Sequence, residues 1–172
     1  LYQFHNTHLL ASCAIMNGSR KEAARYAAKC RDDIPADYYA STSPFREFVH
    51  YLASTPVFAA IRYGQWDELL AMPDAPDTAV YQKILVSFGK GMAHARKGQV
   101  AAAENDLKSI QQWMESDAGI KIKMGALNSG YDGAVVASNM LSGAIAEAKG
   151  DFTAAALGFK KAVDAGMAGQ DD

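Results

Sequence analysis

Apolar residues recur along this chain at the three- and four-residue spacing of helix faces, from the first residues to the last apolar stretch. Sustained alternation of apolar and polar residues, bounded by hairpin turns, is nearly absent, so strands are not expected. The helical stretches are rich in Ala, Leu, Lys, Glu and Met, which favour helix. The pattern predicts an all-α protein.

Four short segments align with one another: "MNGSRKEAARYA", "RYGQWDELLAMP", "RKGQVAAAENDL" and "AKGDFTAAALGF". Each has a glycine with an apolar helical stretch before it and another after it; the glycines are Gly18, Gly64, Gly98 and Gly150. A glycine just past the end of a helix takes the left-handed backbone that closes the turn. Five residues later come Ala23, Leu69, Ala103 and Ala155, where we expect the two helices to approach closely. Each segment therefore predicts an αα-hairpin.

These residues resemble the tetratricopeptide repeat (TPR) family, whose unit is about 34 residues long. When the four segments are aligned with this unit, position 8, where the family has a small residue, holds Ala11, Val57, Gly91 and Gly143. Position 24, where the family has a large apolar residue, holds Ala27, Pro73, Leu107 and Phe159. Repeat units then lie near 4–35, 44–76, 78–116 and 134–167, with insertions near 36–43 and 117–133. The resemblance implies a single all-α domain of αα-hairpin repeats, stacked as a right-handed superhelix.

The second unit departs from the family pattern, because Pro73 and Pro76 break its second helix. We expect that helix to cover only "QWDELLAM", and the helix before it to begin near Ser43. The glycine-rich second insertion predicts a loop or a short extra turn, or else an extension of the helix before it or after it. The stretches "FHNTHLL" and "IRYGQWDELLAMPDAP" look like a bacterial group of longer TPR proteins, so we expect an internal fragment, and the compartment, cytoplasmic or periplasmic, stays open.

Bulk properties exclude some classes of function. With 17 basic and 19 acidic residues the net charge is −2, so no large basic field exists to hold nucleic acid. No apolar run approaches the roughly 20 residues that span a bilayer. Two cysteines, Cys13 and Cys30, make no disulfide framework, and we expect both to pack as small apolar residues on helix faces. The sequence predicts no cofactor.

The family resemblance implies a concave groove lined by the first helix of each unit. Its groove positions fall on His5, His8, Ser12, Ile15 and Met16; on Tyr51, Ser54, Phe58, Ile61 and Arg62; on Leu85, Phe88, Met92, Ala95 and Arg96; and on Ala137, Met140, Ala144, Glu147 and Ala148. We take His5, His8, Ser12, Tyr51, Arg62, Phe88, Met92 and Arg96 as the candidate binding residues. The basic set with which some TPR domains grip acidic chaperone tails is absent at the matching positions. The mixed aromatic and polar groove suits a peptide or helix of a partner protein.

His5 and His8, three residues apart on one helix, allow three interpretations. They are half of a metal site, polar contacts of the groove, or partly buried packing residues. A zinc site needs three or four protein ligands, and neither His50 nor His94 clearly points at the pair. A metal would therefore need ligands from repeats outside this chain.

No catalytic constellation stands out, since the chain has no HExxH, no phosphate loop and no nucleophile elbow. The leading hypothesis is a non-enzymatic scaffold that binds a protein or peptide in its groove. The alternative is a metal- or small-molecule-binding protein, either a simple binding protein or an enzyme, that uses His5 and His8 with residues from missing repeats. A third possibility is that the fragment associates with itself.

Overall fold

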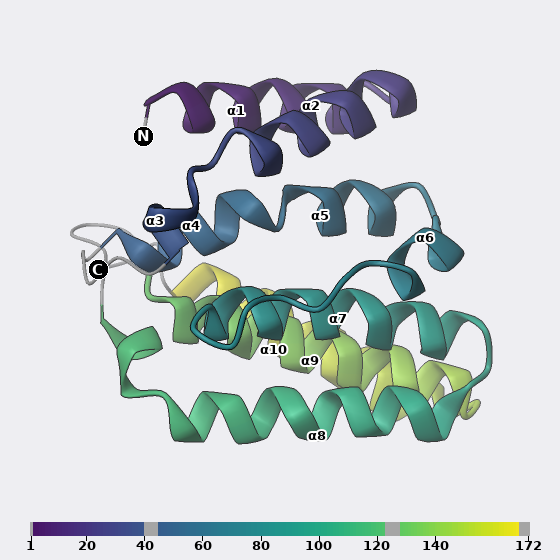
Figure 1. Cartoon of the computed structure of the whole chain (residues 1–172). Helices are drawn as coiled ribbons and strands as arrows, with labels where there is room; N and C mark the ends of the chain where they lie inside the picture. The colour runs from purple at the N-terminus through teal and green to yellow at the C-terminus, as the bar shows by residue number, and fades with distance from the viewer. Residues whose placement is uncertain (1, 40–44, 123–127, 169–172) are drawn as a thin grey trace.

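The structure is a computed structural model that describes residues 2–39, 45–122 and 128–168 of the 172-residue chain. The described part is all-α, as predicted, and contains no strand (Figure 1). Its helices are α1 (Tyr2–Met16), α2 (Arg20–Asp32), α3 (Ala36–Tyr39), α4 (Arg46–Ala53), α5 (Thr55–Arg62), α6 (Trp66–Leu70), α7 (Val80–Arg96), α8 (Val100–Ser116) and, after the 3₁₀ turn η1 (Ala118–Lys121), α9 (Gly130–Ala148) and α10 (Phe152–Ala168).

All four predicted turn glycines have the left-handed backbone, with φ of 80° at Gly18, 65° at Gly64, 73° at Gly98 and 79° at Gly150. They are the only residues with positive φ in the part of the chain that the structure describes. Each turn is closed the same way: Gln99 N, for example, donates to His94 O at 2.9 Å, and Gly98 N donates to Ala95 O at 3.0 Å. This pair of bonds satisfies carbonyls that the helix end leaves free. The prediction of helix–glycine–helix turns is confirmed.

The helix pairs stack in chain order, and their turns lie along one side of the stack (Figure 1). α7 packs against α4 and α5 on one side and against α9 on the other, while α8 also contacts α9. The first helix of each pair thus contacts the first helix of the next. This packing is compatible with a helical repeat.

Small residues set the closest contacts between helices. Ala23, Ala103 and Ala155 are buried, as expected from their place five residues after a turn glycine. The backbones of α9 and α10 approach closely, since a Cβ at Gly158 would lie only 2.8 Å from the Cα and N of Gly143. A larger residue at either position would force the helices apart.

The second unit is irregular at two places. α6 is a short helix that ends before Pro73, as predicted. The helix before it is broken at Ser54 into α4 and α5, which we did not predict; it begins at Arg46, and the expected start at Ser43 lies outside the described residues. Pro56 explains the break, because it has no N–H to donate to the Leu52 carbonyl one turn earlier. The Thr55 hydroxyl donates to that carbonyl instead, at 2.6 Å.

The fourth unit begins earlier than the expected residue 134. α9 starts at Gly130, where a capping box holds its first turn: Ser129 Oγ accepts from Asp132 N at 3.2 Å, and Ser129 N donates to Asp132 Oδ2 at 2.8 Å. The short extra turn expected in the second insertion is η1, and residues 123–127 of that insertion lie outside the described part.

The two cysteines differ from each other. Cys30 is fully buried, as predicted, between α1, α2 and α4. The same prediction was wrong for Cys13, which is exposed because no described helix covers the outer face of α1. None of the described helices is long and apolar enough to cross a membrane.

Candidate binding surface

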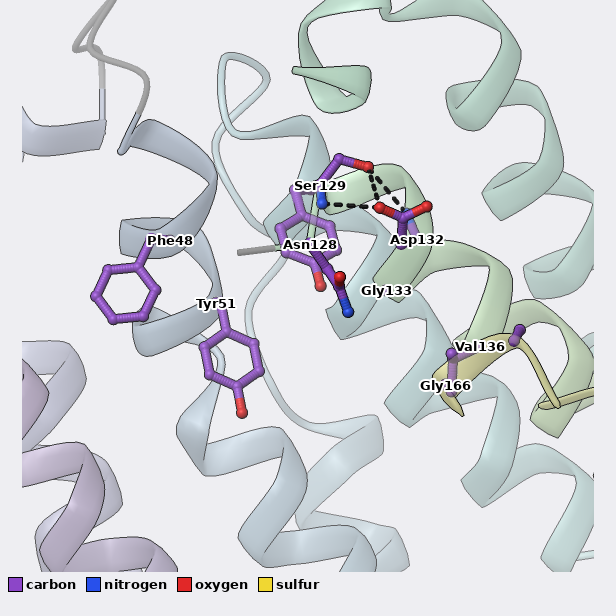
Figure 2. Close-up of a pocket in the computed structure, with 10 residues that line it drawn as sticks. Phe48, Tyr51, Asn128, Ser129, Asp132, Gly133, Val136 and Gly166 are labelled. Carbon is purple, nitrogen blue, oxygen red and sulfur yellow. Dashed lines mark hydrogen bonds between the residues drawn. The ribbon is translucent and has the colours of Figure 1, made fainter. Parts of the chain in front are cut away.

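A hollow of about 370 Å³ opens beside Tyr51, where three helix pairs meet (Figure 2). Phe48 and Tyr51 of α4 form one side, and the start of α9 with its preceding residues forms the other. The described residues that line it are Phe48, Tyr51, Tyr81, Asn128, Ser129, Asp132, Gly133, Val136, Ala165 and Gly166. The lining is mostly apolar, with its polar groups gathered at the start of α9.

Tyr81 of α7 forms the base of this hollow and is 6 % exposed. Glycine makes room for its ring, because a Cβ at Gly133 would overlap the Tyr81 hydroxyl. Burial, and then the nearby Tyr51, Glu47 and Asp132, raise the pKa of Tyr81, so the hydroxyl stays protonated at neutral pH and can donate a hydrogen bond.

Among the described residues that line the hollow, Asp132 is the one with a charged side chain. Its Oδ2 accepts from both the backbone N and the hydroxyl of Ser129, at 2.8 and 2.7 Å. These bonds fix the carboxylate at the edge of the hollow (Figure 2). The charge favours a neutral or basic group as the occupant.

The two histidines lie behind the aromatic side of the hollow and pack against α4. The His8 ring meets the Tyr51 ring edge-on at 5.1 Å between centroids, and the His5 ring lies 5.9 Å from Phe48. Phe48 and Tyr51 are themselves stacked at 6.5 Å. His5 and His8 therefore support Tyr51 and Phe48.

Both nitrogens of His8 are engaged. Since the Thr55 hydroxyl donates to Leu52, it accepts from His8 Nδ1 at 2.9 Å, while Ser12 Oγ donates to His8 Nε2 at 3.4 Å. This pairing assigns a neutral ring with its proton on Nδ1. Burial, with a smaller effect of His5, lowers the pKa of His8 and keeps it neutral.

The other predicted residues are scattered. Phe88 and Met92 are core residues, each 5 % exposed, because α7 is covered by its neighbouring helices; they offer no open surface. Arg96 pairs with Glu147 of α9 at 3.0 Å, at the edge of a separate shallow hollow. Arg62 is exposed at the end of α5. Of the predicted set, only Tyr51 lines the hollow.

No group of three or more His, Cys, Asp or Glu side chains could hold a metal ion within residues 2–39, 45–122 and 128–168. A metal bound to either nitrogen of His8 would displace the hydrogen bond that this nitrogen makes. The remaining histidines are paired elsewhere, His50 with Glu47 and His94 with Asp106 at 2.7 Å.

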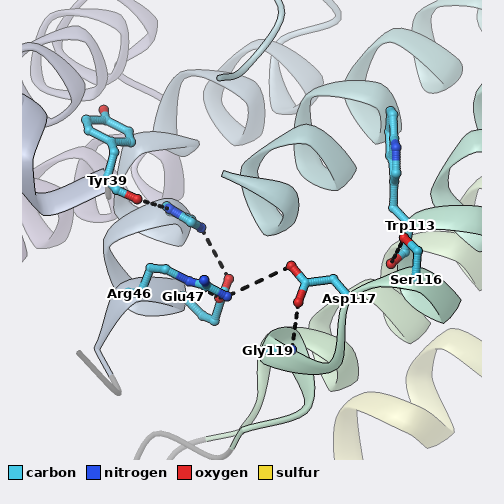
Figure 3. A network of polar contacts seen from close by, with 8 residues as sticks. Tyr39, Arg46, Glu47, Trp113, Ser116, Asp117 and Gly119 are labelled. Carbon is cyan, nitrogen blue, oxygen red and sulfur yellow. Dashed lines mark hydrogen bonds and ion pairs between the residues drawn. The ribbon is translucent and has the colours of Figure 1, made fainter. Parts of the chain in front are cut away.

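A buried polar network behind α4 was missed at the level of sequence (Figure 3). Glu47, 3 % exposed, contacts His50 Nδ1 at 3.2 Å and accepts from Arg46 Nε at 2.7 Å. His50 Nε2 reaches Tyr39 O at 3.3 Å, and Arg46 approaches Asp117 at 3.9 Å. The network thus ties α4 to both insertions. The i,i+3 spacing of Glu47 and His50 was the available signal.

Glu47 stays ionised in this network. Burial alone would raise the pKa of Glu47, but the hydrogen bonds from His50 and Arg46 and their charges outweigh it and lower that pKa. The two partners of His50 are both acceptors, so the ring makes both hydrogen bonds at once only when it carries two protons. The Glu47 carboxylate is thus the buried half of an ion pair with Arg46, and it has His50 as a further hydrogen-bond partner.

A second, smaller hollow of about 200 Å³ lies where α6 is cut short. Met72, Pro73 and Pro76 form one wall, and Gln82 and Val86 of α7 form another. Gln82 Oε1 is buried and has no hydrogen-bond partner among the described residues. The truncated helix therefore leaves a buried polar atom that no described residue satisfies.

A scan against protein-family models and searches of curated proteins and of solved structures found no match to this chain. The case for its function therefore comes from its own residues.

Proposed function

We propose that this chain is a TPR-like αα-hairpin scaffold that binds a segment of a partner protein and catalyses no reaction. The observation that carries the proposal is the hollow beside Tyr51, because residues from three successive helix pairs contribute to it. A surface built by several stacked pairs is the kind of site that solenoid repeats use for partners.

The lining favours a peptide with an apolar or aromatic anchor residue. Phe48 and Tyr51 give flat apolar contact surface, and the Tyr81 hydroxyl and the Asp132 carboxylate give a donor and an acceptor. A small number of polar groups placed among apolar ones orients a ligand, and apolar contact rather than charge alone then holds it. A basic residue next to the anchor would be favoured by Asp132.

The test is selection of peptides from a random library against the purified chain, followed by affinity measurement with variants. Tyr51→Ala should weaken binding of the selected peptides by at least about tenfold, as expected for an anchor contact. Val136→Trp should block binding by filling the hollow. Leu157→Ala is the control, since Leu157 is 54 % exposed on α10 and does not line the hollow.

Two results would reject the proposal. One is the failure to select any peptide that binds the folded chain. The other is a selected peptide whose affinity is the same for the Tyr51→Ala, Val136→Trp and control proteins.

A further inference from the structure

The smaller hollow, of about 200 Å³, lies against the segment 71–79 that joins α6 to α7. Its lining is mostly apolar: Val57 comes from α5, Val86 from α7, and Met72 and Pro73 from the segment itself. An apolar cavity of roughly 150 Å³ holds a benzene molecule. The hollow therefore has room for a molecule of one or two small rings.

Gln82 contributes to this hollow a polar atom that lacks a partner. The residue is 8 % exposed, and its Oε1 is buried and accepts no hydrogen bond from the described residues. A buried carbonyl oxygen without a donor costs free energy, whereas an apolar side chain of similar length would avoid that cost. The stability of the fold therefore does not account for a glutamine at this position. A ligand that donates a hydrogen bond to Oε1 does.

The charged groups of the lining already have partners. Among the described residues that line the hollow, Arg31 and Asp74 are the charged ones. Arg31 Nε donates to Asp32 Oδ1 at 2.8 Å, and Lys90 Nζ donates to Asp74 Oδ1 at 2.7 Å. An ionic ligand would lose its hydration and would have to compete for these pairs. The lining thus favours a neutral ligand.

One wall of the hollow can move to admit a ligand. Because Oε1 of Gln82 is buried, a ligand reaches it only when part of the wall shifts. The segment 71–79 is fastened to α7 by two ion pairs, and their aspartates, Asp74 and Asp77, are 89 % and 99 % exposed. Exposed ion pairs add little to stability, so the segment shifts at low cost. Met72, with its flexible side chain, can adapt to the bound molecule.

We propose that this hollow binds a small, neutral, mostly apolar molecule that donates one hydrogen bond to Gln82 Oε1. Two compounds serve as probes of this chemistry. Indole has two fused apolar rings and one N–H group. Benzothiophene has the same ring shape but no donor, so the two probes differ in the hydrogen bond to Oε1.

Titration of the 172-residue chain with each probe, followed by NMR, tests the proposal. Indole should bind at least about fivefold more tightly than benzothiophene, because only indole can donate to Oε1. Gln82→Met should remove this preference and leave the binding of benzothiophene in place. Ala75→Phe adds a ring to the lining and should block both probes.

The matched control is Gln111→Met, which makes the same chemical change at an exposed position of α8. This variant should bind both probes like the unaltered chain. Circular dichroism checks that each variant is folded. The two hollows share no lining residue in the described part of the chain, so Tyr51→Ala should also leave the binding of indole unchanged.

Four results would overturn the proposal. Indole may fail to bind the folded chain, or the two probes bind the unaltered chain equally well. The preference for indole survives Gln82→Met, or Tyr51→Ala abolishes the binding of indole, which would place the probe in the other hollow. None of these results depends on whether the hollow beside Tyr51 binds a peptide.

Discussion

The second and fourth helix pairs hold their helices together by different means. α9 and α10 are long, unbroken helices that meet through Gly143 and Gly158, with almost no polar contact between them. α4 and α5 are short, separated by Ser54, and fastened by Glu47 and His50 to their surroundings. Regular helices can rely on close packing, whereas a broken helix exposes backbone groups that need side-chain partners. Specific changes in each region test this difference.

The largest effect is expected at His50. His50→Ala removes one of the hydrogen-bond partners of the buried Glu47 carboxylate, and the loss of such a partner of a buried charge costs about 3 kcal/mol of unfolding free energy. Urea unfolding followed by circular dichroism measures the loss. The double variant Glu47→Met, His50→Leu removes the buried carboxylate together with the imidazole and should lose less than His50→Ala alone. Equal stability of His50→Ala and the unaltered chain would mean that the network does not hold α4.

A smaller loss is expected in the fourth pair. Gly158→Ala places a methyl group 2.8 Å from the backbone of Gly143, so the helices must separate, at a cost of about 2 kcal/mol. Gly166→Ala on the same helix is the matched control, because its Cβ would meet only Val136 among the described residues, at 3.9 Å. That change should be neutral or raise stability by up to about 1 kcal/mol. Thermal unfolding of the two variants separates close packing from helix propensity.

Acid should lower the stability of the second helix pair, to which His8 of α1 is hydrogen-bonded, before it lowers that of the fourth pair. The folded pKa of His8 is lowered, so the unfolded chain binds a proton first, and stability falls as pH drops below the ordinary histidine value of 6.5. His8→Asn, which keeps a donor for Thr55, should flatten the dependence of stability on pH between about 7 and 5. Urea midpoints at several pH values measure it. An unchanged slope would show that another group carries the acid sensitivity.

The smallest effect is expected at Gln82, on α7 between the two regions. Gln82→Met removes a buried oxygen without a partner and keeps a similar length, so it should raise stability by about 1 kcal/mol. A fall in the urea midpoint would instead mean that Gln82 Oε1 is satisfied in solution.

The same contrast explains what could be predicted from the sequence. The turn glycines follow a local rule, so Gly18, Gly64, Gly98 and Gly150 identified the helix pairs correctly. The break at Ser54 depends on Pro56, whose position inside an apolar stretch did not outweigh the helical pattern. Phe88 and Met92 were expected in a groove, but their burial depends on how closely neighbouring pairs pack. The hollow joins residues from α4 to α10, and no local pattern brings these together.

The reactivity of the Cys30 thiol reports on the opening of the junction between the first helix pair and α4. Its thiol contacts Phe4 O at 3.4 Å and Leu52 O at 3.5 Å, and burial raises its pKa, so the reactive thiolate forms only when these helices separate. Cys13, exposed on the same pair, reacts without any opening. In a single labelling experiment, the fast reaction of Cys13 gives the total amount of protein. The slow reaction of Cys30 measures how often the junction opens.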